Sequence, residues 1–205
     1  MVALAREDLN TAFIKAFEAS SFRCAEMAVE AIPRLQRFFE DYPEYHFAVE
    51  GRPPRPDRAR EVFESLPPAE WPFERKWLLE FSGAGGEMMA MADVISNLFV
   101  DGVWHIGLFV VATPLHGRGA AHGIYNDLEA WMRDGGARWL RLGVVEGNVR
   151  AERFWERLGY IEVRRRFDVE MGERMNNLRV MVKPLATATI PEYLALVARD
   201  RPETP

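Results

Sequence analysis

Residues 111–121, with the sequence VATPLHGRGAA, decide the fold. They follow a mostly apolar run at 103–111, which predicts a strand, and they lead into apolar residues at helical spacing, which predict a helix over 121–132. A helix N-terminus presents unpaired backbone amides and a partial positive charge, and glycine lets an anion approach them closely. The two glycines of this turn, Gly117 and Gly119, therefore suit a phosphate site, although an ordinary strand-to-helix connection is equally compatible with them.

Two other phosphate-binding motifs do not fit this turn. A P-loop ends in Gly-Lys-Ser or Gly-Lys-Thr, and the turn contains no such ending. The dinucleotide motif Gly-x-Gly-x-x-Gly needs a third glycine, but the third residue after Gly119 is His122. A pyrophosphate surrounded by the amides of residues 117–121 stays compatible with the sequence.

The remaining sequence predicts a helical first third and then alternating strands and helices. Proline-rich stretches divide the first third into separate helices, whereas glycine turns separate the later strands. We expect strands at 21–27, 77–82, 87–97, 103–111, 139–145, 160–169 and 178–182. We expect helices at 9–17, 31–39, 57–66, 121–132, 148–158 and 190–197.

Composition limits the class of protein. A chain of 205 residues, 48% hydrophobic and 28% charged, is long enough for one well-buried domain. A formal net charge of -5 and a pI near 5.5 argue against a nucleic-acid partner. Cys24 is the single cysteine, which suits a reducing compartment, and neither a secretory signal nor a membrane-spanning run is visible. We therefore expect a cytoplasmic protein with no membrane partner, and four histidines without ligand spacing predict no metal site.

A second segment lies one helix and one strand after the glycine turn: residues 148–160, with the sequence NVRAERFWERLGY. Together the two segments resemble the GNAT superfamily of acyl-CoA-dependent N-acyltransferases. The pyrophosphate motif of that family is Arg/Gln-x-x-Gly-x-Gly/Ala, and here His116 replaces its first residue. The later family features are Asn-x-x-Ala, an aromatic pair and Leu-Gly-Phe/Tyr, matched here by Asn148, Ala151, Phe154, Trp155, Leu158, Gly159 and Tyr160. The motif resemblance covers about residues 103–160.

The resemblance implies an α/β (α+β) fold. Its sheet is mixed, mostly antiparallel and splayed at the cofactor site, with helices on both faces. The acyltransferase domain would span 21–185, between an appended N-terminal helix at 1–20 and a C-terminal extension at 186–205. We expect the appended helices to cover a sheet edge or to help form a homodimer.

The resemblance also implies acetyl-CoA as cosubstrate, with no metal. In the family, the strand before the turn exposes backbone groups that pair with pantetheine as an added strand would, near an amide that can stabilise the oxyanion. The residues expected to bind the cofactor are Phe109, Val110, Val111, His116, Gly117, Arg118, Gly119, Ala120, Ala121, His122, Asn148 and Trp155. Arg118, His122, Arg150 or Arg153 would meet the 3′-phosphate, unless these arginines only pair with Glu152 and Glu156 on a solvated helix face.

The catalytic groups depart from the family pattern. Many members use a Tyr seven residues after the Asn as general acid, and some use a Glu five residues before it as base, but these positions hold Trp155 and Gly143. The remaining base candidates are His105, Glu146 and Asp93, and His105 has an ordinary pKa suited to proton transfer near neutrality. The alternatives are a packed histidine, an exposed turn glutamate, an inward-facing aspartate and a chain of waters.

These features predict an N-acetyltransferase that moves an acetyl group from acetyl-CoA to a primary amine of a small molecule or peptide by direct attack on the thioester. The alternative is a GNAT-fold module that binds acyl-CoA with little or no turnover, because both usual catalytic residues are missing. Glu40, Asp41, Glu44 and Glu50 either attract a cationic amine or only keep the surface soluble. Cys24 is expected to be a buried structural residue rather than a nucleophile.

Overall fold

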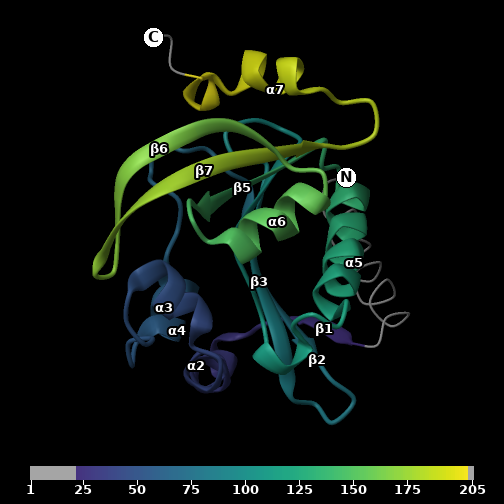
Figure 1. Ribbon diagram of the computed structural model, residues 1–205. Helices are drawn as coiled ribbons and strands as arrows, with labels where there is room; N and C mark the ends of the chain where they lie inside the picture. Colours follow the sequence, from purple (N-terminus) through teal and green to yellow (C-terminus); the bar gives the residue numbers. More distant parts are fainter. Residues whose placement is uncertain (1–21, 203–205) are drawn as a thin grey trace.

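The computed structural model describes residues 22–202, so the helix predicted at 9–17 lies outside the described residues. Within them, one sheet has the strand order β1-β2-β3-β4-β5-β7-β6 (Figure 1). Its strands are β1 (Arg23–Glu26), β2 (Arg75–Ser82), β3 (Met88–Ser96), β4 (Val103–Val111), β5 (Trp139–Val145), β6 (Ile161–Met171) and β7 (Arg174–Pro184). Neighbouring strands are antiparallel except for β4 and β5, which are parallel. The predicted mixed, mostly antiparallel sheet is confirmed.

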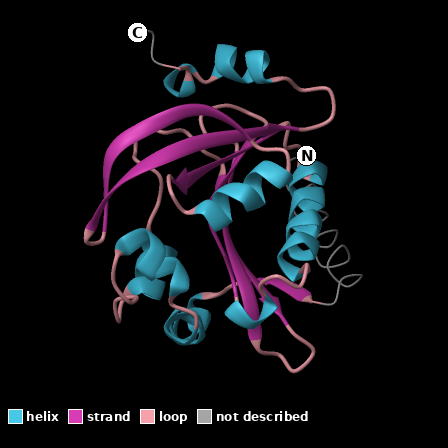
Figure 2. Cartoon of the chain, in the orientation of Figure 1, coloured by secondary structure: helices cyan, strands magenta, loops and turns pink. Residues whose placement is uncertain are grey.

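Helices cover both faces of this sheet (Figure 2). The α-helices are α2 (Ile32–Asp41), α3 (Glu44–Glu50), α4 (Arg58–Glu64), α5 (Ala120–Asp134), α6 (Val149–Arg157) and α7 (Ile190–Leu196). Successive residues of a strand point to opposite faces, so Leu79 packs in the cluster with α5 and α6 while Leu78 packs in the cluster with α2 and α4. The sheet is therefore buried between two helical layers. None of the helices in residues 22–202 is long and apolar enough to cross a bilayer.

The C-terminal residues pack against the end of β5 and β7. Figure 1 shows α7 beside the arched β6–β7 hairpin. Thr189 and Glu192 form a capping box at the start of α7, and the Trp139 indole donates to the Thr189 carbonyl oxygen at 2.9 Å. Tyr193 from α7 is fully buried against Trp139. This packing places the short 3-10 helix at Ala198–Asp200 over the same end of the sheet.

Helix α3 was not predicted, because a seven-residue segment shows little periodicity. It ends at Gly51, whose φ of 76° provides the left-handed turn typical of a helix C-terminus. Its last turn receives the tip of the β6–β7 hairpin: the Glu173 amide donates to the Glu50 carbonyl at 2.8 Å, and the Asn176 side chain donates to the Val49 carbonyl at 3.0 Å. Strand β7 is longer than predicted because the hairpin continues to this contact. The hairpin therefore bridges the open side of the sheet.

Candidate functional site

Strands β4 and β5 separate in the middle of the sheet. Their register pairs Val103 with Trp139 and ends where Ile106 meets Leu142, although both strands continue for several residues. A β-bulge lies at this point, because Val94 of β3 faces Ile106 while Asp93 faces Leu108, which leaves Gly107 as the extra residue. Beyond the bulge, the edge of β4 that faced β5 has no strand partner among residues 22–202. The predicted splay is present.

The turn after β4 presents free backbone amides. Gly117 and Gly119 have φ of 73° and 81°, a region that glycine adopts without steric cost. The amide before this segment, of His116, donates to Thr113, and the amide after it, of His122, donates to Gly119. For the amides of residues 117–121, no acceptor is found within the described residues. The N-terminus of α5 is therefore open to an anion.

His116 stabilises the strand end rather than providing a cation. Its Nε2 lies 2.7 Å from the Val111 carbonyl oxygen and donates to it, while Nδ1 is buried with no partner among residues 22–202. Burial lowers the pKa of His116, so the ring is neutral at pH 7.

A cavity of about 640 Å³ runs from this turn to α6; we call it the turn cavity. Ten of the twelve residues predicted to bind the cofactor line it, whereas Arg118 and Ala120 do not. Arg150, Arg153 and Arg157 of α6 also line it, and none of them forms a salt bridge within the described part of the chain. The alternative pairing with Glu152 and Glu156 does not occur, because both glutamates pair with Arg179. As far as the described residues go, the turn cavity thus combines amides without acceptors and guanidinium groups without salt bridges.

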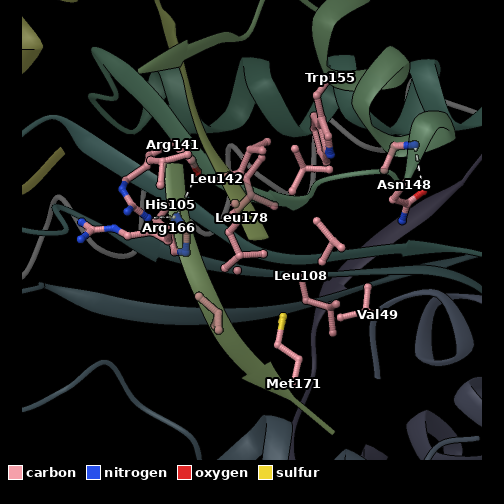
Figure 3. Close-up of a pocket in the computed structure, with 18 of the residues that line it drawn as sticks. Val49, His105, Leu108, Arg141, Leu142, Asn148, Trp155, Arg166, Met171 and Leu178 are labelled. Atoms are coloured by element: carbon pink, nitrogen blue, oxygen red, sulfur yellow. Dashed lines mark hydrogen bonds between the residues drawn. The ribbon is translucent and has the colours of Figure 1, made fainter. Parts of the chain in front are cut away.

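A second cavity, of about 730 Å³, lies between the splayed strands and the β6–β7 hairpin; we call it the hairpin cavity (Figure 3). Figure 3 shows Trp155 and Asn148 near one end and His105, Arg141 and Arg166 near the other. Both cavities share the residues Tyr45, Phe109, Asn148, Ala151 and Trp155. They therefore meet where β4 leaves β5.

Asn148 holds the start of α6 at this junction. Its side-chain oxygen accepts from the Ala151 amide at 3.3 Å, which confirms the predicted N-cap. Trp155, which stands at the usual Tyr position, is buried among aromatic rings: its centroid lies 5.9 Å from Phe109, 5.7 Å from Tyr125 and 5.3 Å from Tyr160. Trp155 thus lines both cavities at the point where they meet.

Tyr45 is a functional candidate that the sequence reasoning missed. It lies on α3, a helix that was not predicted, and it lines both cavities. Burial raises the pKa of Tyr45 to about 12, so its phenol stays protonated near neutrality and can donate a hydrogen. The sequence offered only a weak signal for it, because Tyr45 is one aromatic residue in a seven-residue helix, which is too short to recognise from its periodicity.

His105 lies in the hairpin cavity next to Arg141. Its Nδ1 is 3.1 Å from the Arg141 carbonyl oxygen and 3.3 Å from the Arg141 guanidinium. With the hydrogen on Nδ1 the ring donates to the carbonyl, and Nε2 keeps its lone pair. Burial and the positive charge of Arg141 lower the pKa of His105 to about 3, so the imidazole is neutral in the free protein.

The other two base candidates lie elsewhere. Glu146 does not line either cavity, since its carboxylate accepts from Arg165 at 2.6 Å and from Asn177 at 3.1 Å. Asp93 forms a salt bridge of 3.2 Å with Lys76 in the interior, where burial raises its pKa.

The acidic residues expected near an acceptor also lie away from the hairpin cavity. Glu40 accepts from Gln36, Glu44 lines the turn cavity, and Glu50 pairs with Arg58 at 3.3 Å. Asp41 is exposed and does not line the hairpin cavity either. Cys24 is buried, as predicted, and burial raises the pKa of its thiol.

A buried ion pair supports the His105 end of the hairpin cavity. The Asp200 carboxylate is fully buried and accepts from Arg141 Nε at 2.7 Å, from Arg141 Nη2 at 3.2 Å and from the Tyr193 hydroxyl at 2.6 Å. Arg166 Nη2 lies 3.3 Å from the same carboxylate. Burial opposes the charge, but these donors more than offset it and lower the pKa of Asp200.

Solved structures of acetyltransferases share this fold. An acetyltransferase from Thermus thermophilus has 23% sequence identity and a TM-score of 0.62, over 81% of this chain and 98% of that chain. The ribosomal-protein-S18-alanine N-acetyltransferase from Escherichia coli has 15% identity and a TM-score of 0.60, over 82% and 97% of the two chains. The spermidine N-acetyltransferase from Vibrio cholerae, in complex with CoA and spermine, has 11% identity and a TM-score of 0.62, over 80% and 95%. No curated protein sequence matches the chain.

The family model described as "Acetyltransferase (GNAT) family" matches residues 35–160, which is more than half of the chain. The matched range includes the glycine turn, the splayed strands and α6. Members of this family use acetyl-CoA to acetylate amine acceptors. The chain therefore belongs to the GNAT family and is an acetyl-CoA-dependent N-acetyltransferase.

Proposed function

We propose that this enzyme acetylates a primary amine of a small molecule or peptide that enters through the hairpin cavity. The observation that carries the proposal is the junction of two cavities at the point where β4 leaves β5. An acceptor in the hairpin cavity would meet an acetyl group presented from the turn cavity. Holding both reactants at one junction removes most of the entropy loss of a bimolecular encounter.

Several features of the turn cavity support acetyl-CoA as the donor. The amides of residues 117–121 have no acceptor among residues 22–202 and suit the pyrophosphate, and the arginines of α6 that form no salt bridge there suit the 3′-phosphate. The unpaired edge of β4 at Phe109, Val110 and Val111 suits a pantetheine arm added like a strand. When bound, acetyl-CoA supplies the activated acetyl group as a thioester.

Tyr45 is the proton donor in this proposal. A bond forms between the amine nitrogen and the acetyl carbonyl carbon while the bond to sulfur breaks, and the sulfur then needs a proton. The Tyr45 phenol lines both cavities, and although burial raises its pKa to about 12 and so weakens it as an acid, it remains far more acidic than the Trp155 indole. Tyr45 thus replaces the tyrosine that many relatives carry on α6.

His105 is the candidate base, ahead of Glu146. The ammonium form of the acceptor must lose a proton before it attacks, and His105 lines the hairpin cavity while Glu146 is paired outside it. A pKa of about 3 makes the imidazole a weak base in the free enzyme. Burial is the first cause of this low pKa and the charge of Arg141 the second, so negative charge near Arg141 beyond that of Asp200 would make the ring a stronger base.

Release of thiol from acetyl-CoA across a panel of primary amines tests the function. We expect acceptor-dependent thiol release, and the His105→Gln variant should lower kcat more than it weakens CoA binding. Tight CoA binding without acceptor-dependent thiol from any amine would contradict the proposal and would favour a binding-only module. An unchanged pH–rate profile in His105→Gln would remove this residue from the mechanism.

A further inference from the structure

Three guanidinium groups gather at the His105 end of the hairpin cavity. Arg141 comes from β5, Arg166 from β6 and Arg199 from the short 3-10 helix near the C-terminus, and all three line the cavity. We call them the arginine cluster. Figure 3 shows Arg141 and Arg166 together beside His105, away from Trp155 and Asn148.

The charge of this cluster is not balanced. Among the described residues, Asp200 is the one carboxylate that pairs with it, through Arg141 at 2.7 Å and Arg166 at 3.3 Å, and one carboxylate cannot neutralise three guanidinium groups. Within residues 22–202, no Asp or Glu side chain lines the hairpin cavity. The charge of Arg165, the neighbour of Arg166 on β6, is balanced in contrast, because Glu146 and Glu162 both pair with it. The cluster end of the cavity therefore carries a net positive charge.

Arg199 is the member with the most unused hydrogen-bonding capacity. Its guanidinium stacks on Trp71, 3.7 Å from the ring centroid, and no salt bridge of Arg199 is found in the described part of the chain. Its Nε is buried and has no hydrogen-bond partner among residues 22–202. Burial, together with repulsion from Arg166 and Arg141, lowers the pKa of Arg199. A buried donor without a partner is unfavourable, and an anionic oxygen would satisfy it.

We propose that the arginine cluster binds an anionic oxygen group, a carboxylate or a phosphate, on the acceptor, so that the substrates are amines carrying such a group. This inference rests on the proposed function, because it uses the hairpin cavity as the acceptor site. Planar guanidinium groups match the geometry of carboxylate and phosphate oxygens. The hydrogen bonds between them are strongest when water is largely excluded. The same positive charge disfavours polyamines.

The spacing along β4 suggests how long the acceptor is. His105 marks the cluster end and Phe109 marks the junction of the cavities, four residues later on the strand. At about 3.3 Å per residue, with the bulge at Gly107 included, these levels are roughly 10 Å apart. The α-amine and the carboxylate of an α-amino acid are too close together to span this distance. A linear amino acid of about six carbons fits better.

A bound anion would also change His105. Burial is the largest cause of the low pKa of His105 and the positive charge of Arg141 is the second, and a negative group beside the cluster would offset the second. The groups nearest the ring are the Arg141 carbonyl and guanidinium, Asp200 pairs with Arg141 and Arg166, and Arg166 and Arg199 also line the cavity. The acceptor would thus bring the negative charge that makes His105 a better base.

Calorimetry on the protein, with and without CoA, tests the inference without requiring turnover. The probes are two matched pairs, 6-aminohexanoate with 6-aminohexanamide and 6-aminohexyl phosphate with 6-aminohexanol, together with spermidine. We expect the anionic member of at least one pair to bind about tenfold more tightly than its neutral partner, a difference of about 1.4 kcal/mol. The pair with the larger ratio shows whether the natural group is a carboxylate or a phosphate.

Variants link that preference to the cluster. Arg199→Gln and Arg166→Gln should each bring the ratio of the affinity for the anionic probe to the affinity for its neutral partner close to one. Arg199→Lys should keep part of this preference because the charge stays. Arg60→Gln removes an equally positive residue from the exposed face of α4, which does not line the cavity, and should keep the wild-type ratio. Melting temperatures and CoA affinity of each variant report whether the fold is intact.

Three results would overturn the inference: ratios near one for both pairs, spermidine as the tightest ligand, or ratios that survive in both glutamine variants. Absence of binding for every anionic probe at millimolar concentration would also overturn it. Anion preference without thiol release would refute only the proposed catalytic function. Thiol release without anion preference would refute only the assignment of the acceptor.

Discussion

The buried carboxylate of Asp200 provides the strongest stability prediction. It is fully buried and accepts hydrogen bonds from Arg141 and from Tyr193. In Asp200→Asn the shape is kept, but the negative charge is lost and an NH₂ group replaces one accepting oxygen. Arg141, which is 6% exposed, is then left without its counter-charge. Removal of one partner of a buried ion pair costs about 3–5 kcal/mol.

The expected change in melting temperature follows from the length of the chain. Unfolding entropy near 60 °C is about 2.1 cal/mol/K per residue, or roughly 0.43 kcal/mol/K for 205 residues. A loss of about 3–5 kcal/mol therefore lowers the melting temperature by roughly 7–12 °C. Differential scanning calorimetry measures this shift, and urea unfolding followed by circular dichroism measures the free energy. Asp134→Asn is the control, because Asp134 is exposed and lies 3.9 Å from Arg133, and it should leave stability nearly unchanged.

The contribution of the Arg141–Asp200 ion pair to the free energy of unfolding depends on pH in a definite direction. The folded pKa of Asp200 is lowered, so its carboxylate contributes stability above the unfolded pKa of about 3.9, and this contribution is lost as pH falls through the folded pKa. The difference between wild type and Asp200→Asn should therefore be largest at neutral pH and should shrink below about pH 4. A difference under about 1 kcal/mol at pH 7, or one that stays constant during acidification, would refute the reasoning about this ion pair.

Three further changes test the site and its supports. Gly119→Val should weaken CoA binding at least about tenfold, because a side chain would enter the anion site, whereas Gly136→Val, also at positive φ but at the other end of α5, should not. Equal CoA affinities in calorimetry would contradict the phosphate assignment. Tyr45→Phe should lower kcat by about 10²-fold or more with CoA affinity kept, and an unchanged kcat would exclude Tyr45 as the acid. Gly172→Ala should destabilise more than Gly86→Ala in urea, because a Cβ at 172 would lie 2.6 Å from the end of α3 while one at 86 meets nothing within 4 Å. Equal losses of stability in Gly172→Ala and Gly86→Ala would show that the positive φ, and not the contact with α3, sets the cost of the substitution.

The tertiary contacts explain why some residues escaped prediction. Tyr45 reaches the junction of the cavities only because the hairpin tip packs on the last turn of α3, a contact between residues more than 120 positions apart. Arg141 and Asp200 are 59 residues apart, and nothing in either local sequence indicates that they pair. Glu146 was a plausible base from its place in the chain, but Arg165, 19 residues later, pairs with it, and Glu146 lines neither cavity.

The sequence by itself determined the features that depend on neighbouring residues. The glycine turn at 117–119, the N-cap at Asn148 and the alternation of apolar residues in β2 to β5 follow from backbone conformation and side-chain direction within a few positions, so they could be read before the structure was known. The tertiary structure decided which distant side chains share a cavity, because packing of the β6–β7 hairpin and the C-terminal residues depends on contacts over the whole chain. The glycine turn and α6 that line the turn cavity lie in the first category, and the arginine cluster of the hairpin cavity lies in the second.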